Sequence, residues 1–455
     1  MSLLKNYITL IMAWTTYFVR TTTFCRCSLH AIASLTEGQR KTITHNIRIL
    51  NKELEDFSSH YKLYSRDQWD PQNLFKPVIM QSGLFDSEDY IQIVGDFTTI
   101  RKTGKHIPFT ATCRDPMSPK YHPNLIWGMI FLQLSFIAPL YKTHGLPARS
   151  LPIQWDVLPR LPKPRINDKE EKWTEYRNFQ KENNRSDYFV KQLTQLRHSI
   201  DEAGWASKRL LVSLDGDFCN RKVLNAPRDR IDLLLRARKN IKLCYRAIDE
   251  GRRFYSSDKF TPEGIRQDEK IEWKSSQIFH GGEWRKVDYK EVKDVYWQTG
   301  AKRQPLRLIV VRPIPYRRTK KGKLLYRQPA YLITTDLLTD VEKLLQAYFD
   351  RWEIEVNHKE EKHILGVGQA QIRNENSIRK QTSLVVASYS ILLLASISEG
   401  CIEEQANMKE ESQWYKNSKR PSCNSLRKKL LKEIQSSEID LFHLFYNAMR
   451  TENVA

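Results

Sequence analysis

The stretch RLLVSLD at residues 209–215 decides the fold class of this chain. It is a short apolar run that ends on an aspartate, a pattern typical of a strand buried on both faces of a sheet. Residues 168–206, just before it, are highly charged with few Gly or Pro, which predicts a long helix. Three earlier apolar runs each predict a strand: YIQIVGD (90–96), NLIWGMIFLQLSFI (124–137) and ARSLPIQWDVL (148–158). The order of three strands, a helix and a strand indicates a mixed α/β core.

The chain changes character twice after residue 215. Residues 228–239 predict a helix, and NIKLCYRAI (240–248) predicts a strand that completes the core. Residues 270–336 contain several strand-like runs separated by Gly-containing or very basic turns, which predicts an inserted sheet outside the α/β layer. Helices are expected from Asp340 to about Ala395, with a break at Gly366–Gly368.

Both ends of the chain show helical patterns. Residues 1–80 alternate apolar and basic stretches, and in TEGQRKTITHNIRIL (36–50) either Thr36 or Thr42 is suited to cap a helix. The C-terminal part is polar and Lys-rich, with one apolar segment at residues 439–445. We therefore expect five regions: a helical, DNA-binding N-terminal region (1–84), a first core segment (85–249), an inserted β subdomain (250–335), core helices (336–400) and a helical tail (401–455).

The charge balance points to a polyanionic partner. The 455 residues include 74 Lys and Arg against 53 Asp and Glu, a formal net charge of +21. Nucleic acid is the simplest partner for such an excess, and the alternative is a basic surface that serves solubility. The apolar stretch 7–19 is too short for a membrane span, so we expect a helix there and no membrane partner. Seven scattered cysteines predict reduced thiols in a cytoplasmic protein.

Two aspartates leave the predicted sheet at comparable points. Asp96 follows the run YIQIVG, and Asp215 follows RLLVSL. Metal-dependent phosphodiester cleavage needs carboxylates from separate elements to converge on two divalent ions ~3.5–4 Å apart. The ends of buried strands hold short side chains rigidly while leaving them accessible, so these two aspartates are candidate metal ligands.

The third carboxylate comes from the predicted helix AYFDRWEIEVNHKEEK (347–362). At about 100° per residue, one face carries four residues: Tyr348, Arg351, Glu355 and Lys362. Glu355 is thus an acid flanked by an aromatic ring and two cations, and these three neighbours are suited to hold DNA phosphates. The alternative is an ordinary surface helix in which Arg351 and Glu355 form an i,i+4 ion pair.

These blocks together resemble those of the IS4-type insertion-sequence transposases, the superfamily that includes the Tn5 transposase. GDFTT (95–99) resembles the first acidic block, LLVSLDGDFCN (210–220) the second, and YFDRWEIEVNHKEEK (348–362) the Tyr-Arg-Glu-Lys block of that family. The likeness spans roughly residues 85–400. It implies that Asp96, Asp215 and Glu355 form the catalytic and metal-binding triad.

The resemblance also implies a fold, cofactors and partners. The fold would be α/β: an RNase H-like mixed-sheet core with an inserted all-β subdomain and helical N- and C-terminal regions. The cofactors would be two Mg²⁺ or Mn²⁺ ions. A homodimer would pair two transposon ends on double-stranded DNA, nick them, form hairpins and transfer the strands into target DNA, in a prokaryotic cytoplasm and on its nucleoid. Some members stack an extruded base on an aromatic of the inserted sheet; Tyr331 is the candidate here, its alternative being a core position.

Other assignments stay open at this point. A triad of Asp215, Asp336 and Glu355 is conceivable, although Asp336 also suits a turn before the Asp340 helix. His358 and His363 are offset by five residues and not by the four that a helical zinc site uses, so they are expected to approach DNA or solvent. Two other functions compete with an active transposase: an RNase H-fold nuclease of the repair or resolvase type, and a catalytically idle DNA-binding relative.

Overall fold

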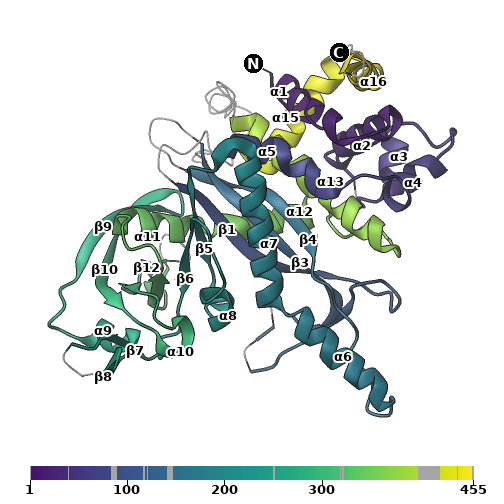
Figure 1. The fold of residues 1–455 in the computed structure, drawn as a ribbon. Coiled ribbons are helices and arrows are strands. Elements are labelled where there is room, and N and C mark those ends of the chain that lie inside the picture. Colours follow the sequence, from purple (N-terminus) through teal and green to yellow (C-terminus); the bar gives the residue numbers. More distant parts are fainter. Residues whose placement is uncertain are drawn as a thin grey trace.

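The structure is a computed structural model that describes residues 2–452 except 39, 83–89, 116–117, 120, 141–146, 249–251, 318, 320–321, 398–420 and 438. Its centre is one mixed sheet of ten strands (Figure 1). Nine of them follow the order β2-β3-β1-β5-β6-β14-β11-β10-β9, and the tenth, β4, pairs with β3. The strands are β1 (Tyr90–Arg101), β2 (Ala111–Arg114), β3 (Leu125–Pro139), β4 (Ala148–Val157), β5 (Arg209–Leu214), β6 (Ile231–Arg236), β9 (Lys274–His280), β10 (Glu283–Val295), β11 (Leu306–Val311) and β14 (Ala330–Thr334). The predicted α/β class with an RNase H-like mixed sheet and helical terminal regions is confirmed.

Helices cover both faces of this sheet. On one face α7 (Arg185–Ile200) packs Phe189 and Leu193 into the same apolar core as Leu210 and Val212 of β5. On the other face lie α11 (Val341–Asp350) and α12 (Glu353–His363). The side chains of β5 alternate between the two faces of the sheet, since Leu211 packs with residues of α11. A strand buried on both faces favours apolar residues at successive positions, which is why Leu210, Leu211 and Val212 follow one another.

The terminal helices form one layer around a single core helix. They are α1 (Leu3–Met12), α2 (Thr21–Ser34), α3 (Ile43–Ile49), α4 (Ser58–Ser65), α5 (Lys76–Ser82), α15 (Cys423–Ser436) and α16 (Leu441–Glu452). α1, α2, α4 and α15 all contact α13 (Glu375–Ile397), and α16 contacts α2 (Figure 1). α13 is long and apolar enough to cross a membrane, but 94% of its apolar window is buried inside the protein. This burial is what a core helix requires. Thr42 caps α3, accepting a hydrogen bond from the His45 amide, as predicted.

Two predicted helices differ from the structure. Residues 168–206 form α6 (Glu170–Glu182) and α7, separated at Asn183 and Asn184, because the Asn184 side chain accepts from the Asp187 amide and starts a new helix. Residues 228–239 contain β6, so the helix predicted there is wrong. β6 pairs in parallel with β5 on one side and antiparallel with β14 on the other. These two pairings hold as a strand a stretch whose apolar residues suited either structure.

The prediction that residues 270–336 form a sheet outside the α/β layer is also wrong. β9, β10, β11 and β14 extend the central sheet beyond β6 instead of forming a layer of their own. Among the described residues, two small hairpins stand apart: β7 (Leu243–Arg246) with β8 (Tyr255–Phe260), and β12 (Pro315–Tyr316) with β13 (Leu325–Tyr326). The short helices α8 (Arg221–Leu224), α9 (Pro262–Gln267) and α10 (Gln298–Ala301) lie between strands along the chain. The expected region boundaries at 84/85, 249/250 and 400/401 lie outside the described residues.

Candidate active site

Strand pairing brings Asp96 and Asp215 side by side. β1 and β5 run parallel in a register that ends with Gly95 opposite Leu214, so the next residue on each strand is an aspartate. Asp96 lies within β1 and not at its end as predicted, because β1 continues to Arg101 in its pairing with β3. What ends here is the β1–β5 pairing, and that leaves both side chains accessible.

The two aspartates also point to the same face of the sheet. Side chains alternate along a strand. On β1, Val94 packs against Ile354 of α12, and Asp96 is two residues further along. On β5, Leu211 packs in the α11 cluster, and Asp215 is four residues further along. Both carboxylates therefore face α11 and α12.

Gly95 fixes the approach of these strands. A Cβ atom at this position would lie 2.8 Å from Leu134 Cδ2 and 3.0 Å from Leu214 Cδ2. A larger residue before Asp96 would therefore have to push the ends of these two leucine side chains aside. The Asp96 Oδ1 atom accepts a 2.8 Å hydrogen bond from the Phe97 amide.

α12 supplies the third carboxylate. Arg351 Nη2 donates to Glu355 Oε1 at 3.1 Å, and His358 Nδ1, one turn beyond Glu355, lies 3.9 Å from Asp96 Oδ2. The helix predicted over 347–362 is divided at Arg351 and Trp352, which keep helical dihedral angles while the hydrogen bonds tighten to an i to i+3 pattern. The predicted ion pair of Arg351 with Glu355 exists, and it lies at the site and not on an outer surface.

The charges of the three carboxylates act on one another. Burial raises the pKa of Asp96 to about 7, although Arg351 lowers it, and the charges of Glu355 and Asp215 raise it further. Burial likewise raises the pKa of Glu355, against the opposing effect of Arg351. Arg351 is only 8% exposed, and its guanidinium interacts electrostatically with Asp215, Glu355 and Asp96. One buried guanidinium thus partly neutralises three converging acids.

A buried polar network holds α12 against β4. Arg149 of β4 forms an ion pair with Glu360, and Tyr389 of α13 hydrogen-bonds to both residues. Asn357 Nδ2 donates to the Ser150 carbonyl at 2.8 Å. These contacts lie on the helix faces away from Glu355. They fix the rotation of α12, in which Glu355 accepts from Arg351.

The three carboxylates have the chemistry of a divalent metal site, since Mg²⁺ and Mn²⁺ prefer hard oxygen ligands. Their mutual repulsion is what a bound cation would relieve. Among the described residues, however, no three His, Cys, Asp or Glu side chains are already close enough to ligate one ion. Binding would require Glu355 to turn from Arg351 toward the aspartates.

A family model matches part of this chain. Residues 178–391 match the family model of the transposase DDE domain. This match supports a transposase of the DDE superfamily. The matched segment contains Asp215, Arg351 and Glu355 but begins after Asp96, which lies beside Asp215 through the pairing of β1 with β5. No curated protein matches the chain.

The other residues predicted to contact DNA lie in different surroundings. Tyr348 is partly buried near Arg351, and its pKa, raised by burial, also responds to Asp215 and Glu355. Burial lowers the pKa of Lys362, and the negative charges of Glu361 and Asp96 oppose this effect. Tyr331 lies elsewhere, 5% exposed in β14 with its hydroxyl donating to Glu263. That burial favours the core alternative for Tyr331 over base stacking.

Two residues near Asp96 were not predicted as part of the site. His358 was expected to approach DNA or solvent, but it is 8% exposed and lies beside Asp96; its spacing of three from Glu355 was the available signal. Arg185, the first residue of α7, lies over the Phe97 ring at 5.6 Å and feels the charges of Asp217 and Asp96. Nothing local in the sequence connects it with Asp96.

The alternative triad with Asp336 does not assemble. Asp336 Oδ1 accepts from the Leu338 and Thr339 amides, which is the turn role that its residue type suggested. Its Oδ2 lies 3.4 Å from Arg209, the first residue of β5, whereas Asp215 follows the last. At ~3.3 Å per residue, the six residues of β5 separate Asp336 from Asp215 by about 20 Å.

Proposed function

We propose that this protein is a cut-and-paste DNA transposase of the IS4 type. It binds the terminal inverted repeats of a transposon, cleaves the strands there in a metal-dependent reaction and transfers them into target DNA. Asp96, Asp215 and Glu355 are the proposed catalytic and metal-binding residues. The observation that carries the proposal is the parallel register that ends at Gly95 and Leu214 and sets Asp96 beside Asp215. It is supported by the match of residues 178–391, which include Asp215 and Glu355, to the transposase DDE domain.

Each residue of the site has a defined task in this proposal. Asp96, Asp215 and Glu355 would hold two Mg²⁺ or Mn²⁺ ions. When bound, those ions activate the attacking hydroxyl and stabilise the leaving oxygen of a phosphodiester. Arg351 balances the carboxylate charge, which holds the acids together before DNA arrives. Because Arg351, Lys362 and Tyr348 border the acids, they are the proposed contacts to DNA phosphates.

The proposed partner is double-stranded DNA, first at the transposon ends and then at the target. The excess of 74 basic over 53 acidic residues supports it, because neutralising phosphates releases condensed counterions and gives affinity for any sequence. A homodimer that pairs the two ends in the cytoplasm, on the nucleoid, completes the proposal.

The test uses a supercoiled plasmid carrying the inverted repeats that flank this reading frame. The wild-type protein should nick at the ends in Mg²⁺, and Glu355→Gln should lose cleavage by at least a hundredfold while retaining DNA binding. Glu342→Gln, an exposed acid of α11, is the matched control and should cleave normally.

Three results would change the proposal. Normal cleavage by Glu355→Gln would show that the proposed catalytic triad is wrong. Cleavage of any branched or RNA-containing substrate in preference to the ends would favour the RNase H-fold nuclease. Binding to the ends without any cleavage would favour the idle DNA-binding relative.

A further inference from the structure

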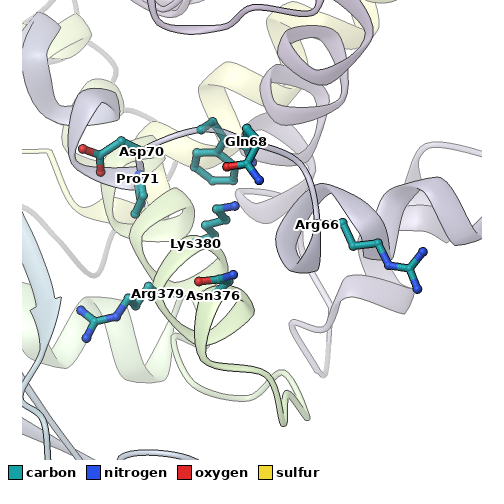
Figure 2. A pocket seen from close by; sticks show the side chains of 8 residues that line it. Arg66, Gln68, Asp70, Pro71, Asn376, Arg379 and Lys380 are labelled. Carbon is teal, nitrogen blue, oxygen red and sulfur yellow. The ribbon is translucent and has the colours of Figure 1, made fainter.

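A cavity of about 280 Å³ lies where the terminal helical layer meets the start of α13. One wall is the connection after α4, with Arg66, Gln68 and Trp69, and the other is the first two turns of α13, with Asn376, Arg379 and Lys380. Figure 2 shows Lys380 between Gln68 and Asn376, with Arg66 and Arg379 on opposite sides of it. At ~30 Å³ per water molecule, the space is large enough for a hydrated phosphate group.

The lining carries more positive than negative charge. It contains three cations and one acid, Asp70, whose Oδ1 is already engaged by the Gln72 amide at 2.9 Å. Lys380 is 8% exposed; its ammonium donates to the Asp67 carbonyl and lies 5.3 Å from the centre of the Trp69 ring. Within the described part of the chain, no carboxylate lies within ion-pair distance of Lys380 or Arg66. Burial lowers the pKa of Lys380, an effect that a bound anion would offset.

One cavity residue, Arg379, is linked through β4 and β3 to the strand that carries Asp96, with Asp156 and Phe97 pointing to the α7 face of the sheet and Asp96 to the α12 face. Arg379 forms an ion pair with Asp156 near the end of β4 and lies 4.9 Å from the centre of the Phe109 ring. Asp156 is opposite Leu132 of β3, and Leu132 is opposite Phe97, the neighbour of Asp96. At ~4.8 Å between adjacent strands, Asp156 is about 10 Å from the backbone beside Asp96.

Arg379 is held rigidly at this edge. The Tyr188 hydroxyl of α7 donates to Asp156 Oδ2 at 2.8 Å, so the acid that orients Arg379 is itself held by a second element. A guanidinium fixed on a carboxylate and an aromatic ring loses little rotamer freedom when it meets a further anion. Arg66, by contrast, is exposed and free to adapt.

We propose that this cavity binds the phosphodiester backbone of a DNA strand running from the active site, with Arg66, Lys380 and Arg379 as its contacts. The inference rests on the proposed DNA substrate and adds a second anchoring point on it. A row of cations beside a cavity recognises the regularly spaced phosphates of a strand without reading its bases. DNA anchored here would bridge the terminal helical layer and the catalytic core.

The test measures binding of the full-length protein to a fluorescent duplex by anisotropy at several KCl concentrations. Each phosphate contact contributes about 0.9 to the slope of log affinity against log salt concentration. Arg66→Gln should therefore reduce the magnitude of that slope by about one unit and weaken binding several-fold at low salt. Arg66→Lys should restore the slope. Lys432→Gln removes an exposed charge on α15 and serves as the control.

Lys380→Gln is the second variant, with its thermal melt recorded to confirm folding. It should lower the slope as Arg66→Gln does. A slope equal to wild type in Arg66→Gln and in folded Lys380→Gln would overturn the cavity inference while leaving the transposase proposal intact, since nicking is assayed separately. Absence of any DNA binding by the wild-type protein would overturn both.

A further arm separates backbone phosphate from free phosphate. Inorganic phosphate is added at constant ionic strength to the wild-type complex. DNA affinity should stay unchanged, because a single free phosphate lacks the neighbouring contacts of a strand. If inorganic phosphate binds the wild-type protein more tightly than Arg66→Gln while the two proteins bind DNA equally, the cavity is a site for free phosphate and the inference is overturned.

Discussion

At the scale of single residues, Glu361 is a buried acid next to Lys362. It is fully buried, neither of its oxygens makes a well-formed hydrogen bond, and burial raises its pKa to about 8. A raised carboxyl pKa means that the folded state keeps the proton, so the wild type loses stability as the pH rises from about 4.5 to about 8. Glu361→Gln should remove this loss and be more stable than wild type at pH 9 by a few kcal/mol.

Urea unfolding at pH 5 and pH 9 checks this prediction. The difference between variant and wild type should be small at pH 5 and large at pH 9. A difference independent of pH would mean that Glu361 is ionised or paired in the folded protein.

Gly95 is the residue whose smallness shapes the site. Gly95→Ala would press a methyl group against Leu134 and Leu214, and the expected cost is about 1–3 kcal/mol of unfolding free energy. Because Asp96 is the next residue, cleavage should fall more than the loss of folded protein explains. Gly264→Ala, where the nearest atom is 3.4 Å from the added carbon, is the control. If folded Gly95→Ala cleaves DNA at the wild-type rate, the prediction that the position of Asp96 limits cleavage is wrong.

Most of the proposed site residues were readable from the sequence, but their neighbours were not. Asp215 follows a continuous apolar run, and Glu355 lies in a patterned helix, so local periodicity indicated both. Arg185 and His358 reach Asp96 through pairings between distant segments. Such pairings depend on which strands and helices meet, and a single sequence carries no local signal of that.

At the scale of elements, the orientation of α12 depends on the buried pair of Arg149 and Glu360, whose side chains are 3% and 12% exposed. Arg149→Met should leave Glu360 buried without its cation and cost about 3–5 kcal/mol. The exposed pair of Arg177 and Glu170 is the matched control, and Arg177→Met should cost less than about 1 kcal/mol. Chemical denaturation measures both. Equal small effects would show that α12 is held by apolar packing instead.

The elements whose hydrophobic pattern was unambiguous were predicted, and those with mixed patterns were not. β1, β3, β4 and β5 are apolar runs, and their existence followed from the sequence. β6 was read as a helix because IDLLLR is short and flanked by arginines, so its periodicity fits either structure. Its identity as a strand comes from β5 and β14 on its two sides. Which sheet β9, β10, β11 and β14 join likewise depends on their pairing partners, and so the sequence predicted a separate sheet for them.

At the scale of the whole molecule, the two ends of the chain stabilise each other. Phe445 of α16 meets Phe24 of α2 edge to face at 5.9 Å, and Arg427 of α15 donates to the Leu35 carbonyl at 2.6 Å. Removing residues 421–455 should expose α2 and α13, lower the melting temperature by several degrees and promote aggregation. Calorimetry and light scattering test this, with removal of residues 453–455 as the control. An unchanged melting temperature would show that the C-terminal helices are dispensable for folding.

The central claim is that Asp96, Asp215 and Glu355 meet at one divalent metal site. The most direct measurement replaces Mg²⁺ by Fe²⁺ with ascorbate and peroxide, so that hydroxyl radicals cut the polypeptide next to the bound ion. We predict cuts near all three residues, suppressed by excess Mg²⁺ and lost in Glu355→Gln. Cuts near Asp336 without cuts near Asp96, or no Mg²⁺-sensitive cuts at all, would contradict the claim.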